Sequence, residues 1–197
     1  MFTGIVEHLG KVASIDTTER GRAITIDAGP ITDGMAVGAS VAVNGVCLTA
    51  VSIDGETLVT EVMGETLDRT SLGDLAAGDS INLERPMAAN GRFDGHIVQG
   101  HVDGVGRVRS LEPDGTARRM WIDVPASLMR YVVEKGSITV DGVSLTVAGV
   151  DEAGLEVALI PHTLEVTTLG ERQPGDTVNL EVDVIAKYVE RMLGASL

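Results

Sequence analysis

The chain has 197 residues, which is enough for one large domain or two small ones with a real hydrophobic core. Its formal net charge is −14 at pH 7 and it has no local run of Lys or Arg, so we expect neither nucleic acid nor an anionic membrane as its partner. The single cysteine cannot form an internal disulfide, no signal peptide is visible, and no apolar run is long enough to span a bilayer. These features predict a cytoplasmic protein.

Short apolar segments that alternate with polar residues follow one another through the first half of the chain. They lie at residues 23–26, 40–43, 58–62 and 80–83, and turns rich in Gly and Asp separate them. Strands at this spacing are typical of a small antiparallel barrel or sandwich. A closed barrel is favoured because a small open sheet leaves unpaired edges.

The sequence contains one hairpin motif twice. Residues 43–49 read VNGVCLT, and residues 140–146 read VDGVSLT. Asn-Gly and Asp-Gly supply the positive φ that a two-residue hairpin turn requires, so each copy predicts a tight β-hairpin. Just past the turn, Cys47 of the first copy is replaced by Ser144 of the second.

The repeat extends through nearly the whole of each half, with order and register kept. Residues 86–95 contain turn formers without periodicity and mark the boundary. We therefore predict an all-β protein of two tandem homologous domains, residues 1–90 and residues 91–184. The matching pairs of segments are residues 3–12 with 99–108, 66–73 with 163–170, and 78–84 with 175–181.

Helical pieces interrupt or follow the strands. Residues 125–133 start with a proline and predict one helix, whereas residues 66–72 and 163–169, each closed by a Gly, predict single turns. Residues 185–197 have no counterpart in the first half and predict a C-terminal helix capped by Asp183. A helix this short must pack on something, either on its own barrel or against a second helix in an oligomer. Its apolar stripe is formed by Ile185, Tyr188, Val189, Met192 and Leu193.

Differences between the copies point to candidate functional residues. Cys47 is either a buried small hydrophobe or a functional thiol beside a turn. His101 replaces Ile5 at an otherwise matched position, and histidine is the commonest general acid or base, although a satisfied structural histidine explains it equally well. His96 and His162 have weaker cases.

Other patterns are weaker or absent. Hydroxyls near the hairpins suit a polar ligand or are ordinary strand residues: Ser40, Thr49, Ser144 and Thr146. Gly4, Gly10, Gly100 and Gly106 lie in strand-like stretches, where glycine indicates a bulge or the close approach of a ligand. The four His and one Cys lack a metal-ligand spacing, and no phosphate-binding loop is present, so we expect no metal.

The duplication itself predicts two similar sites for two similar ligands. Unequal residues in the two copies indicate unequal roles. This favours an enzyme that uses two molecules of one compound, or a carrier with one functional and one decayed site.

Six motifs in order along the chain resemble riboflavin synthase of the alpha-chain type, a family of duplicated lumazine-binding barrels. They read MFTGIVE, NGVCLT, GHIVQGHVDG, KGSI, DGVSLT and LIPHTL. The resemblance implies two six-stranded antiparallel Greek-key barrels and a C-terminal helix that assembles a homotrimer. It implies the dismutation of two 6,7-dimethyl-8-ribityllumazine molecules to riboflavin and 5-amino-6-ribitylamino-2,4(1H,3H)-pyrimidinedione by four-carbon transfer, without a cofactor. Lumazine synthase is a further candidate partner.

The same resemblance implies a site between the first barrel of one chain and the second barrel of its neighbour. His101 would be the base, Cys47, Ser40 or Ser144 would add to the acceptor ring or orient water, and Phe2 would stack on that ring. The first half-site would contain Gly4, Ile5, Val6, Ser40, Cys47, Leu48, Thr49, Glu61, Val62, Met63, Gly64, Glu65 and Thr66. The second would contain Gly100, His101, Val102, Lys135, Ser144, Leu145, Thr146, Leu159, Ile160, Pro161, His162, Thr163 and Leu164.

Two other functions compete with this interpretation. A non-catalytic lumazine or flavin carrier on the same fold would be expected to lose polar residues from one copy, whereas both copies keep theirs. The barrel module of a flavin reductase needs an Arg-x-Tyr-Ser motif, which Tyr131 and Tyr188 do not provide. Phe93 and Asp94 depart from the family pattern in the linker turn, outside the predicted site.

Overall fold

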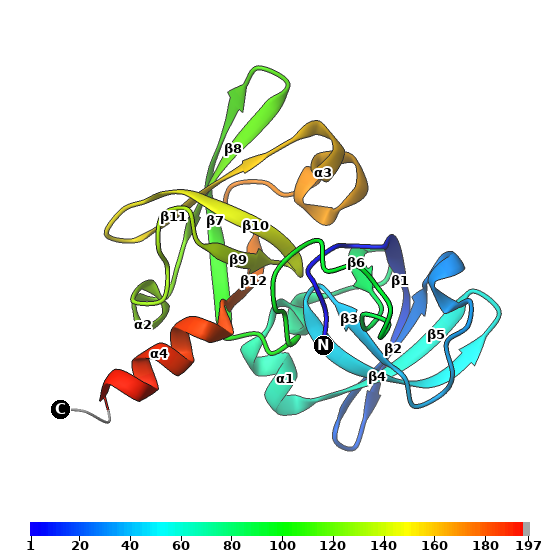
Figure 1. Ribbon diagram of the computed structural model, residues 1–197. Coiled ribbons are helices and arrows are strands. Elements are labelled where there is room, and N and C mark those ends of the chain that lie inside the picture. Colours follow the sequence, from blue (N-terminus) through cyan, green and yellow to red (C-terminus); the bar gives the residue numbers. More distant parts are fainter. Residues whose placement is uncertain (195–197) are drawn as a thin grey trace.

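The computed structural model describes residues 1–194, which form two closed antiparallel barrels lying side by side (Figure 1). The strand order β1-β2-β5-β4-β3-β6 of the first barrel is repeated as β7-β8-β11-β10-β9-β12 in the second. This confirms the predicted duplicated all-β fold. The first barrel contains β1 (His8–Thr18), β2 (Gly21–Asp27), β3 (Ser40–Val43), β4 (Val46–Asp54), β5 (Thr57–Met63) and β6 (Ser80–Glu84). The second contains β7 (Gly104–Asp114), β8 (Ala117–Asp123), β9 (Ser137–Val140), β10 (Val143–Val150), β11 (Gly154–Leu159) and β12 (Thr177–Val182).

Alternate side chains of the strands fill each barrel. In β2, Ile24 and Ile26 are fully buried between more exposed neighbours, and Met120 and Ile122 take the same places in β8. Burial of each such side chain stabilises the fold by about 1.5–3 kcal/mol. Register shifts in β1, β4, β7 and β10 mark β-bulges, which bend the strands and help each sheet to close.

The predicted hairpin turns are present in both copies. Asn44 and Gly45 have φ of 44° and 79°, and Asp141 and Gly142 have φ of 47° and 78°. Positive φ at both central residues matches the type I′ turn that suits a two-residue hairpin. The two turns meet at the interface, where a Cβ added to Gly45 would lie 2.7 Å from the Gly142 nitrogen. Glycine at these positions lets the two barrels touch backbone to backbone.

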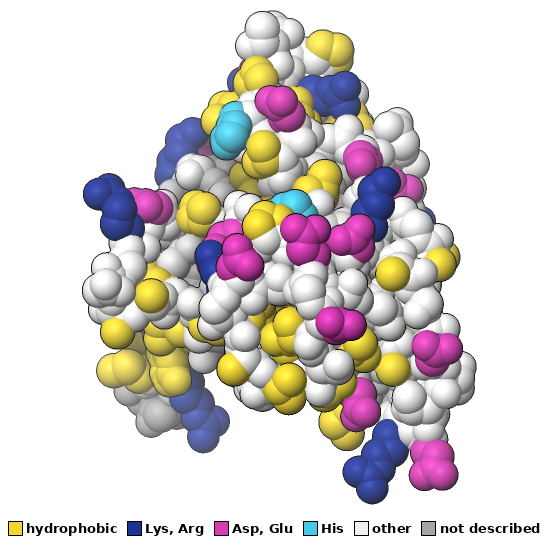
Figure 2. Space-filling model, turned by 90° about the vertical axis from the view of Figure 1, so that its right-hand side faces the viewer, with side chains coloured by type: hydrophobic (Ala, Val, Ile, Leu, Met, Phe, Trp, Pro, Cys, Tyr) yellow, Lys and Arg dark blue, Asp and Glu magenta, His cyan; other side chains and the backbone are white. Residues whose placement is uncertain are grey.

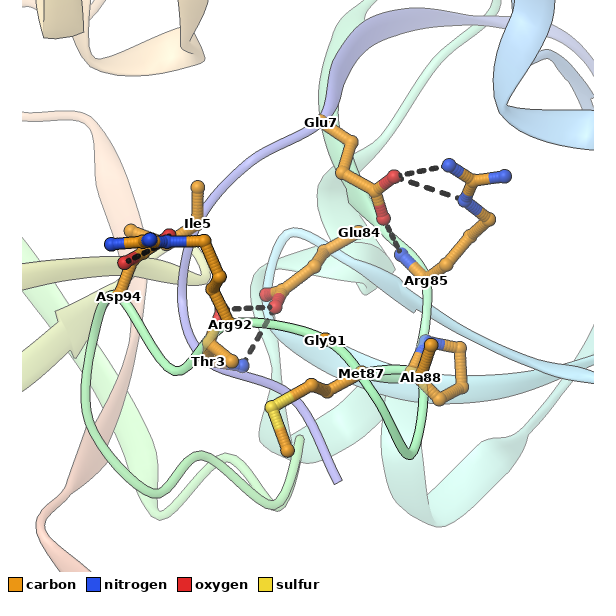
Figure 3. A pocket seen from close by; sticks show the side chains of 11 residues that line it. Thr3, Ile5, Glu7, Glu84, Arg85, Met87, Ala88, Gly91, Arg92 and Asp94 are labelled. Carbon is orange, nitrogen blue, oxygen red and sulfur yellow. Dashed lines mark hydrogen bonds and ion pairs between the residues drawn. The ribbon is translucent and has the colours of Figure 1, made fainter.

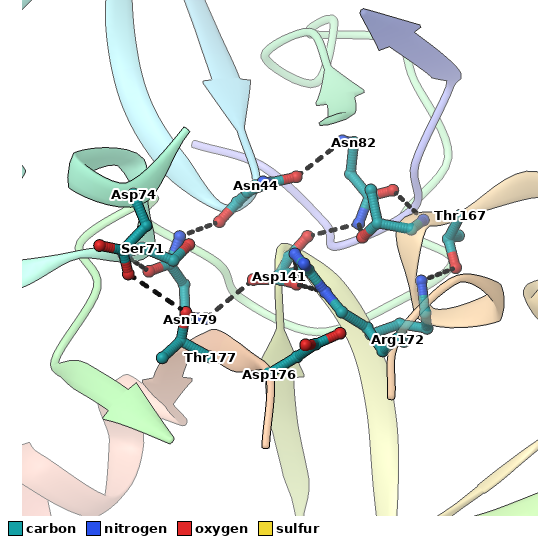
Figure 4. A network of polar contacts seen from close by, with 12 residues as sticks. Asn44, Ser71, Asp74, Asn82, Asp141, Thr167, Arg172, Asp176, Thr177 and Asn179 are labelled. Carbon is teal, nitrogen blue, oxygen red and sulfur yellow. Dashed lines mark hydrogen bonds and ion pairs between the residues drawn. The ribbon is translucent and has the colours of Figure 1, made fainter. Parts of the chain in front are cut away.

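A buried polar network joins the barrels at these turns (Figure 4). The Asn82 amide donates to the Asp141 carbonyl at 2.8 Å, and the Asn179 amide donates to the Asn44 carbonyl at 2.9 Å. The copies differ at the acidic residue, because Asp141 accepts from the Arg172 guanidinium at 2.6 Å. Burial has the largest influence on the Asp141 carboxyl and raises its pKa, whereas the charge of Arg172 acts to lower that pKa.

Several short helices follow the strands. They are η1 (Gly29–Thr32), α1 (Gly64–Arg69), η2 (Ser71–Asp74), α2 (Ala126–Met129), α3 (Pro161–Val166) and η3 (Thr168–Gly170). At residues 66–72 and 163–169, where single turns were predicted, the structure has a six-residue α-helix followed by a 3₁₀ turn, and η1 was not predicted. The prediction of one helix over residues 125–133 was wrong, since α2 stops at Met129. Beyond it, Tyr131 and Val132 donate to carbonyls three residues back, and Lys135 has a left-handed φ of 66° that ends any helix.

The C-terminal helix α4 (Val184–Gly194) extends away from the first barrel (Figure 1). The Asp183 carboxylate accepts from the Ile185 amide at 2.9 Å, which confirms the predicted cap. Two ion pairs join the polar face of α4 to the second barrel. Lys187 pairs with Asp103 at 2.6 Å, and Glu190 pairs with Arg130 at 2.7 Å. The predicted apolar stripe is not packed on its own barrel, because all five of its side chains are exposed: Ile185, Tyr188, Val189, Met192 and Leu193. The last predicted helical residues, 195–197, lie outside the described residues.

Within residues 1–194, no helix has the length and apolar character needed to cross a membrane. Figure 2 shows one face of the molecule, on which hydrophobic side chains gather in patches and acidic and basic side chains are interspersed.

Candidate functional site

Two segments cross between the barrels next to the hairpin turns. The amino-terminal segment, residues 2–5, reaches the second barrel, where the Ser144 amide donates to the Gly4 carbonyl at 2.7 Å. The segment at residues 98–101 reaches the first barrel, where the Cys47 amide donates to the Gly100 carbonyl at 2.9 Å. Phe2 and Val98 form a bridge between the two segments.

This crossing corrects the predicted grouping of the half-sites. Gly4, Ile5 and Val6 belong beside Ser144, and Val6 packs against the core of the second barrel. Gly100, His101 and Val102 belong beside Cys47, and Val102 packs against the core of the first barrel. The sequence repeat matches these segments to the barrels that follow them in the chain, but the carbonyls of Gly4 and Gly100 accept hydrogen bonds from the hairpins of the opposite barrels.

Two glycines allow the close approach. Gly4 and Gly100 have φ of 77° and 76°, and a Cβ added to either would lie 2.6 Å from the Cβ of Ser144 or of Cys47, respectively. The close approach predicted at these glycines is therefore to a neighbouring hairpin. At Gly10 and Gly106 the neighbours are the barrel's own side chains, Leu83 and Leu180 among them.

Buried carboxylates hold both crossing segments. Glu84 accepts from the Thr3 amide at 2.7 Å and from the Gly4 amide at 3.0 Å. Glu181 accepts from the Gln99 amide at 2.7 Å and from the Gly100 and His101 amides at 3.0 Å. Burial raises the pKa of both carboxyls, although the amides that bond them act in the opposite direction. The end of each barrel's last strand thus fixes the path of one segment.

On the first barrel, three predicted residues share one outer face. Ser40 of β3 is the register partner of Thr49 of β4, and Cys47 lies two residues from Thr49 on the same side of the strand. Cys47 and Ser40 are half-buried, and Thr49 is exposed. His101 is exposed on the segment bonded to Cys47. The structure therefore brings a thiol and two hydroxyls to one surface and places the exposed His101 on the segment that is bonded beside it.

The second barrel has the matching face. Ser144 and Thr146 lie two residues apart on β10, with Thr146 exposed and Ser144 half-buried. Exposed Lys135 precedes β9 and has φ of 66°, where the first copy has Gly38 with φ of 91°. A left-handed lysine costs roughly 1–2 kcal/mol relative to the right-handed form. Its presence where glycine would fit favours a role for its side chain at this face.

Some predicted residues cannot offer a side chain to a ligand on these faces. Leu48, Val62 and Leu159 point into the barrel cores. Phe2 is 0% exposed and packs with Ala42, Val98 and Cys47 at the interface. The predicted stacking of Phe2 on a ligand ring is therefore corrected to a packing role, because the crossing of the two segments covers the ring.

The remaining predicted residues frame the outer faces. Around the first face, the end of β5 and the start of α1 supply exposed Glu61, Met63 and Glu65, with half-buried Gly64 and Thr66. Around the second, exposed Ile160, Pro161 and His162 lie at the start of α3, and Leu145, Thr163 and Leu164 are half-buried.

A separate hollow of about 580 Å³ lies between the amino-terminal segment and the linker (Figure 3). Thr3, Ile5 and Glu7 line one side. The backbone amide and the guanidinium of Arg85 both donate hydrogen bonds to the Glu7 carboxylate. Of the predicted site residues only Ile5 lines it, and the hydroxyl-bearing residues Ser40, Thr49, Ser144 and Thr146 do not. Within residues 1–194, no cluster of three or more His, Cys, Asp or Glu side chains could hold a metal ion.

Comparison with known proteins identifies the family. The Lumazine binding domain family matches residues 3–86 and again residues 99–183. Riboflavin synthase of Mycobacterium bovis is 50% identical over 198 residues, covering 98% of this chain and 98% of that protein. Those of Actinobacillus pleuropneumoniae and Bacillus subtilis are 47% and 45% identical over 193 residues, covering 98% of this chain and 90% of each relative. The chain belongs to the riboflavin synthase family. It is an enzyme, as the sequence predicted.

Solved structures share the duplicated barrel. LumP complexed with riboflavin superposes with a TM-score of 0.86 at 24% identity, covering 92% of this chain and 99% of that chain. LumP complexed with 6,7-dimethyl-8-(1'-D-ribityl) lumazine gives a TM-score of 0.83 at 23% identity, with the same coverage. At this level of sequence identity, the similarity to these structures shows a shared fold.

One residue of the site has more contacts than its sequence context suggested. His96 is buried, and its Nδ1 lies 2.8 Å from the Ser144 hydroxyl oxygen. Burial lowers the pKa of His96, and the charge of Asp183 opposes this shift. The sequence signal was its position in the GHIVQGH motif, but Ser144 is distant in the chain and nothing in the repeat pairs the two.

Proposed function

We propose that this enzyme is a riboflavin synthase that converts two molecules of 6,7-dimethyl-8-ribityllumazine into riboflavin and 5-amino-6-ribitylamino-2,4(1H,3H)-pyrimidinedione. A four-carbon unit passes from one lumazine to the other. All atoms of the two substrates are recovered in the two products, so the reaction needs no external oxidant or reductant. The observation that carries this proposal is the pair of equivalent polar faces, one per barrel, in a chain of this family.

The two faces suit unequal roles in that reaction. The first carries Cys47, Ser40 and Thr49 with His101 beside them, and the second carries Ser144 and Lys135. His101 is exposed, and its backbone is fixed by Glu181, so it is a suitable base for the acidic 7-methyl group of a lumazine. Cys47 or Ser40 would add to the acceptor ring or orient water there.

The complete site requires more than one chain in this proposal. The first face of one chain would meet the second face of its neighbour, with one lumazine on each. The exposed apolar stripe of α4 supports assembly, because a contiguous exposed apolar surface typically marks an interaction site. Three chains associated through α4 would form three such sites, and lumazine synthase is a further candidate partner of the assembly.

A product assay separates the proposal from a carrier function. The purified full-length chain is incubated with 6,7-dimethyl-8-ribityllumazine as the only organic reactant, and riboflavin is followed by absorbance and chromatography. We expect one riboflavin for every two lumazines consumed, over many turnovers. Tight binding of lumazine without growth of riboflavin would contradict the proposal and favour the carrier.

A further inference from the structure

A set of hydrogen bonds fastens the segment that carries His101 to β12, the last strand of the second barrel. The Asp103 amide donates to the Leu180 carbonyl at 2.8 Å, and the Val182 amide donates to the Asp103 carboxylate at 3.0 Å. Between these two bonds, the Glu181 carboxylate accepts from the His101 amide at 3.0 Å. The backbone around His101 is therefore held by three consecutive residues of one strand.

The first copy of the repeat contains the same bonds. Glu7 corresponds to Asp103, and its amide donates to the Leu83 carbonyl at 2.9 Å. The Glu7 carboxylate accepts from the Arg85 amide at 2.7 Å. One acidic residue in each copy thus joins a crossing segment to the end of a last strand.

The copies differ in the cation that neutralises this acidic residue. In the first copy the cation is Arg85, whose guanidinium donates to the Glu7 carboxylate at 2.6 Å. Its counterpart Val182 is aliphatic and packs in the core of the second barrel. There the cation is Lys187 of α4, whose Nζ lies 2.6 Å from the Asp103 carboxylate. The second copy thus takes its cation from the C-terminal helix and not from the strand.

Lys187 also balances the charge of two neighbouring carboxylates. Burial has the largest effect on the Glu181 carboxyl and raises its pKa, and the charge of Asp103 adds to this rise. The charge of Lys187 acts to lower that pKa, as do the amides that donate to Glu181. An ionised carboxylate accepts stronger hydrogen bonds than a neutral one. Lys187 therefore favours the form of Glu181 that holds residues 99–101 more tightly.

The ion pair lies where a small displacement would affect the site. The side chains of Asp103 and Lys187 are 18% and 31% exposed, so water screens their attraction only in part. Asp103 follows His101 by two residues. A general base must stay within hydrogen-bond reach of the proton that it removes, and a misplacement of about 1 Å can lower the rate strongly. A contact on α4 can thus influence a residue of the first face.

We propose that Lys187 is a positioning residue that acts through Asp103 to fix the backbone of residues 99–101 and with it the His101 imidazole. The inference rests on the proposed function, in which His101 is the base that removes a proton from the 7-methyl group of a lumazine. It makes the docking of α4 on its own barrel a requirement for full activity of the first face. This role is separate from that of the apolar stripe on the other side of the helix.

Amide hydrogen exchange tests the contact without relying on activity. The full-length wild type and Lys187→Gln are compared by mass spectrometry over residues 99–103. We expect exchange in this stretch to be roughly five- to fiftyfold faster in the variant, which corresponds to the loss of one partly buried charged contact. Unchanged exchange would overturn the proposal, whether or not the wild type forms riboflavin.

The first copy supplies a matched control. Arg85→Gln removes the guanidinium that pairs with Glu7, so it should speed exchange over residues 4–7 and leave residues 99–103 as in the wild type. Lys187→Gln should show the converse. Faster exchange of both stretches in Lys187→Gln would indicate a general loosening of the fold and would overturn the assignment to His101.

Kinetics test whether the contact positions His101. Lys187→Gln should lower kcat roughly five- to fiftyfold with little change in KM, while its particle mass in sedimentation equals that of the wild type. Lys187→Arg keeps the cation and should recover most of kcat. A wild-type kcat or a reduced particle mass in Lys187→Gln, or no recovery in Lys187→Arg, would overturn the positioning role. A wild type that forms no riboflavin would refute the proposed function instead, and the exchange measurement would still decide the contact.

Discussion

At the scale of single residues, the two copies of the repeat differ where chemistry is expected. The exchange of Ile5 for His101 and of Cys47 for Ser144 could be identified from the sequence, and the structure places each of these residues beside an outer face. The burial of Phe2 could not be predicted, because it depends on how two distant segments cross. The partnership of His96 with Ser144 was missed for the same reason.

The lowered pKa of His96 predicts a specific dependence of stability on pH. The unfolded chain binds a proton at this histidine near pH 6.5, whereas the folded chain resists protonation until a lower pH. Neutral His96 therefore makes its full contribution to the free energy of unfolding above about pH 6.5. That contribution is lost as the pH falls toward the pKa of His96 in the folded chain, by at most about 1.4 kcal/mol per pH unit.

Urea unfolding of the wild type and of His96→Asn, between about pH 8 and about pH 5, isolates this contribution. We expect the wild type to lose more stability than the variant as the pH falls. The raised pKa values of Glu84, Glu181 and Asp141 act with the opposite sign, but they are common to both proteins and cancel in the difference. Parallel pH curves would contradict the burial of a neutral His96.

At the scale of elements, strands and turns were the most predictable features. The alternation of apolar residues and the Asn-Gly and Asp-Gly pairs act locally, and the structure shows β-hairpins with positive φ at both turns. The helix expected after Pro125 was too long, because the Tyr131 and Val132 amides donate to carbonyls three residues back and do not continue the α-helix. The end of a helix is less predictable from local sequence than its presence.

The interface network offers a test inside the repeat itself. Asp141 and Arg172 of the second copy correspond to Asn44 and Leu75 of the first, so the first copy shows that the neutral pair fits this fold. Arg172→Leu should lower the free energy of unfolding by about 3–5 kcal/mol, because it leaves a buried carboxylate without its cation. The double variant Asp141→Asn/Arg172→Leu should recover most of that loss.

Urea unfolding of the two single variants and the double variant measures this coupling. The Asn44 side-chain nitrogen has no hydrogen-bond partner within residues 1–194, so the first copy tolerates an amide at the position that corresponds to Asp141. Strictly additive losses would show that Asp141 and Arg172 do not act as a pair.

At the scale of the whole molecule, the duplicated architecture followed from the sequence, but the crossing of the two segments did not. Matching residues 3–12 to residues 99–108 assigns each segment to its own barrel, whereas the Gly4 and Gly100 carbonyls accept hydrogen bonds from the hairpin of the other barrel. Each outer face is consequently built by both halves of the chain. This arrangement explains why a ligand face depends on residues far apart in the sequence.

The exposed stripe of α4 predicts an oligomer that charge can disrupt. Ile185→Asp/Val189→Asp places two carboxylates on the stripe and should reduce the particle mass in sedimentation, since burying an unpaired charge in an interface is unfavourable. Lys187→Gln, on the polar face that contacts Asp103, is the matched control and should leave the mass unchanged. Equal masses for all three proteins would exclude the stripe from assembly.

A complementation assay tests the paired site most directly. His101→Ala damages the first face and should lower turnover roughly 10²- to 10⁴-fold, while Lys135→Ala/Ser144→Ala damages the second face. If one chain's first face works with its neighbour's second face, co-expressed mixtures contain some interfaces with both faces intact. We predict that mixed oligomers form riboflavin from lumazine far faster than either parent. A rate equal to the average of the two parents would contradict a site shared between chains.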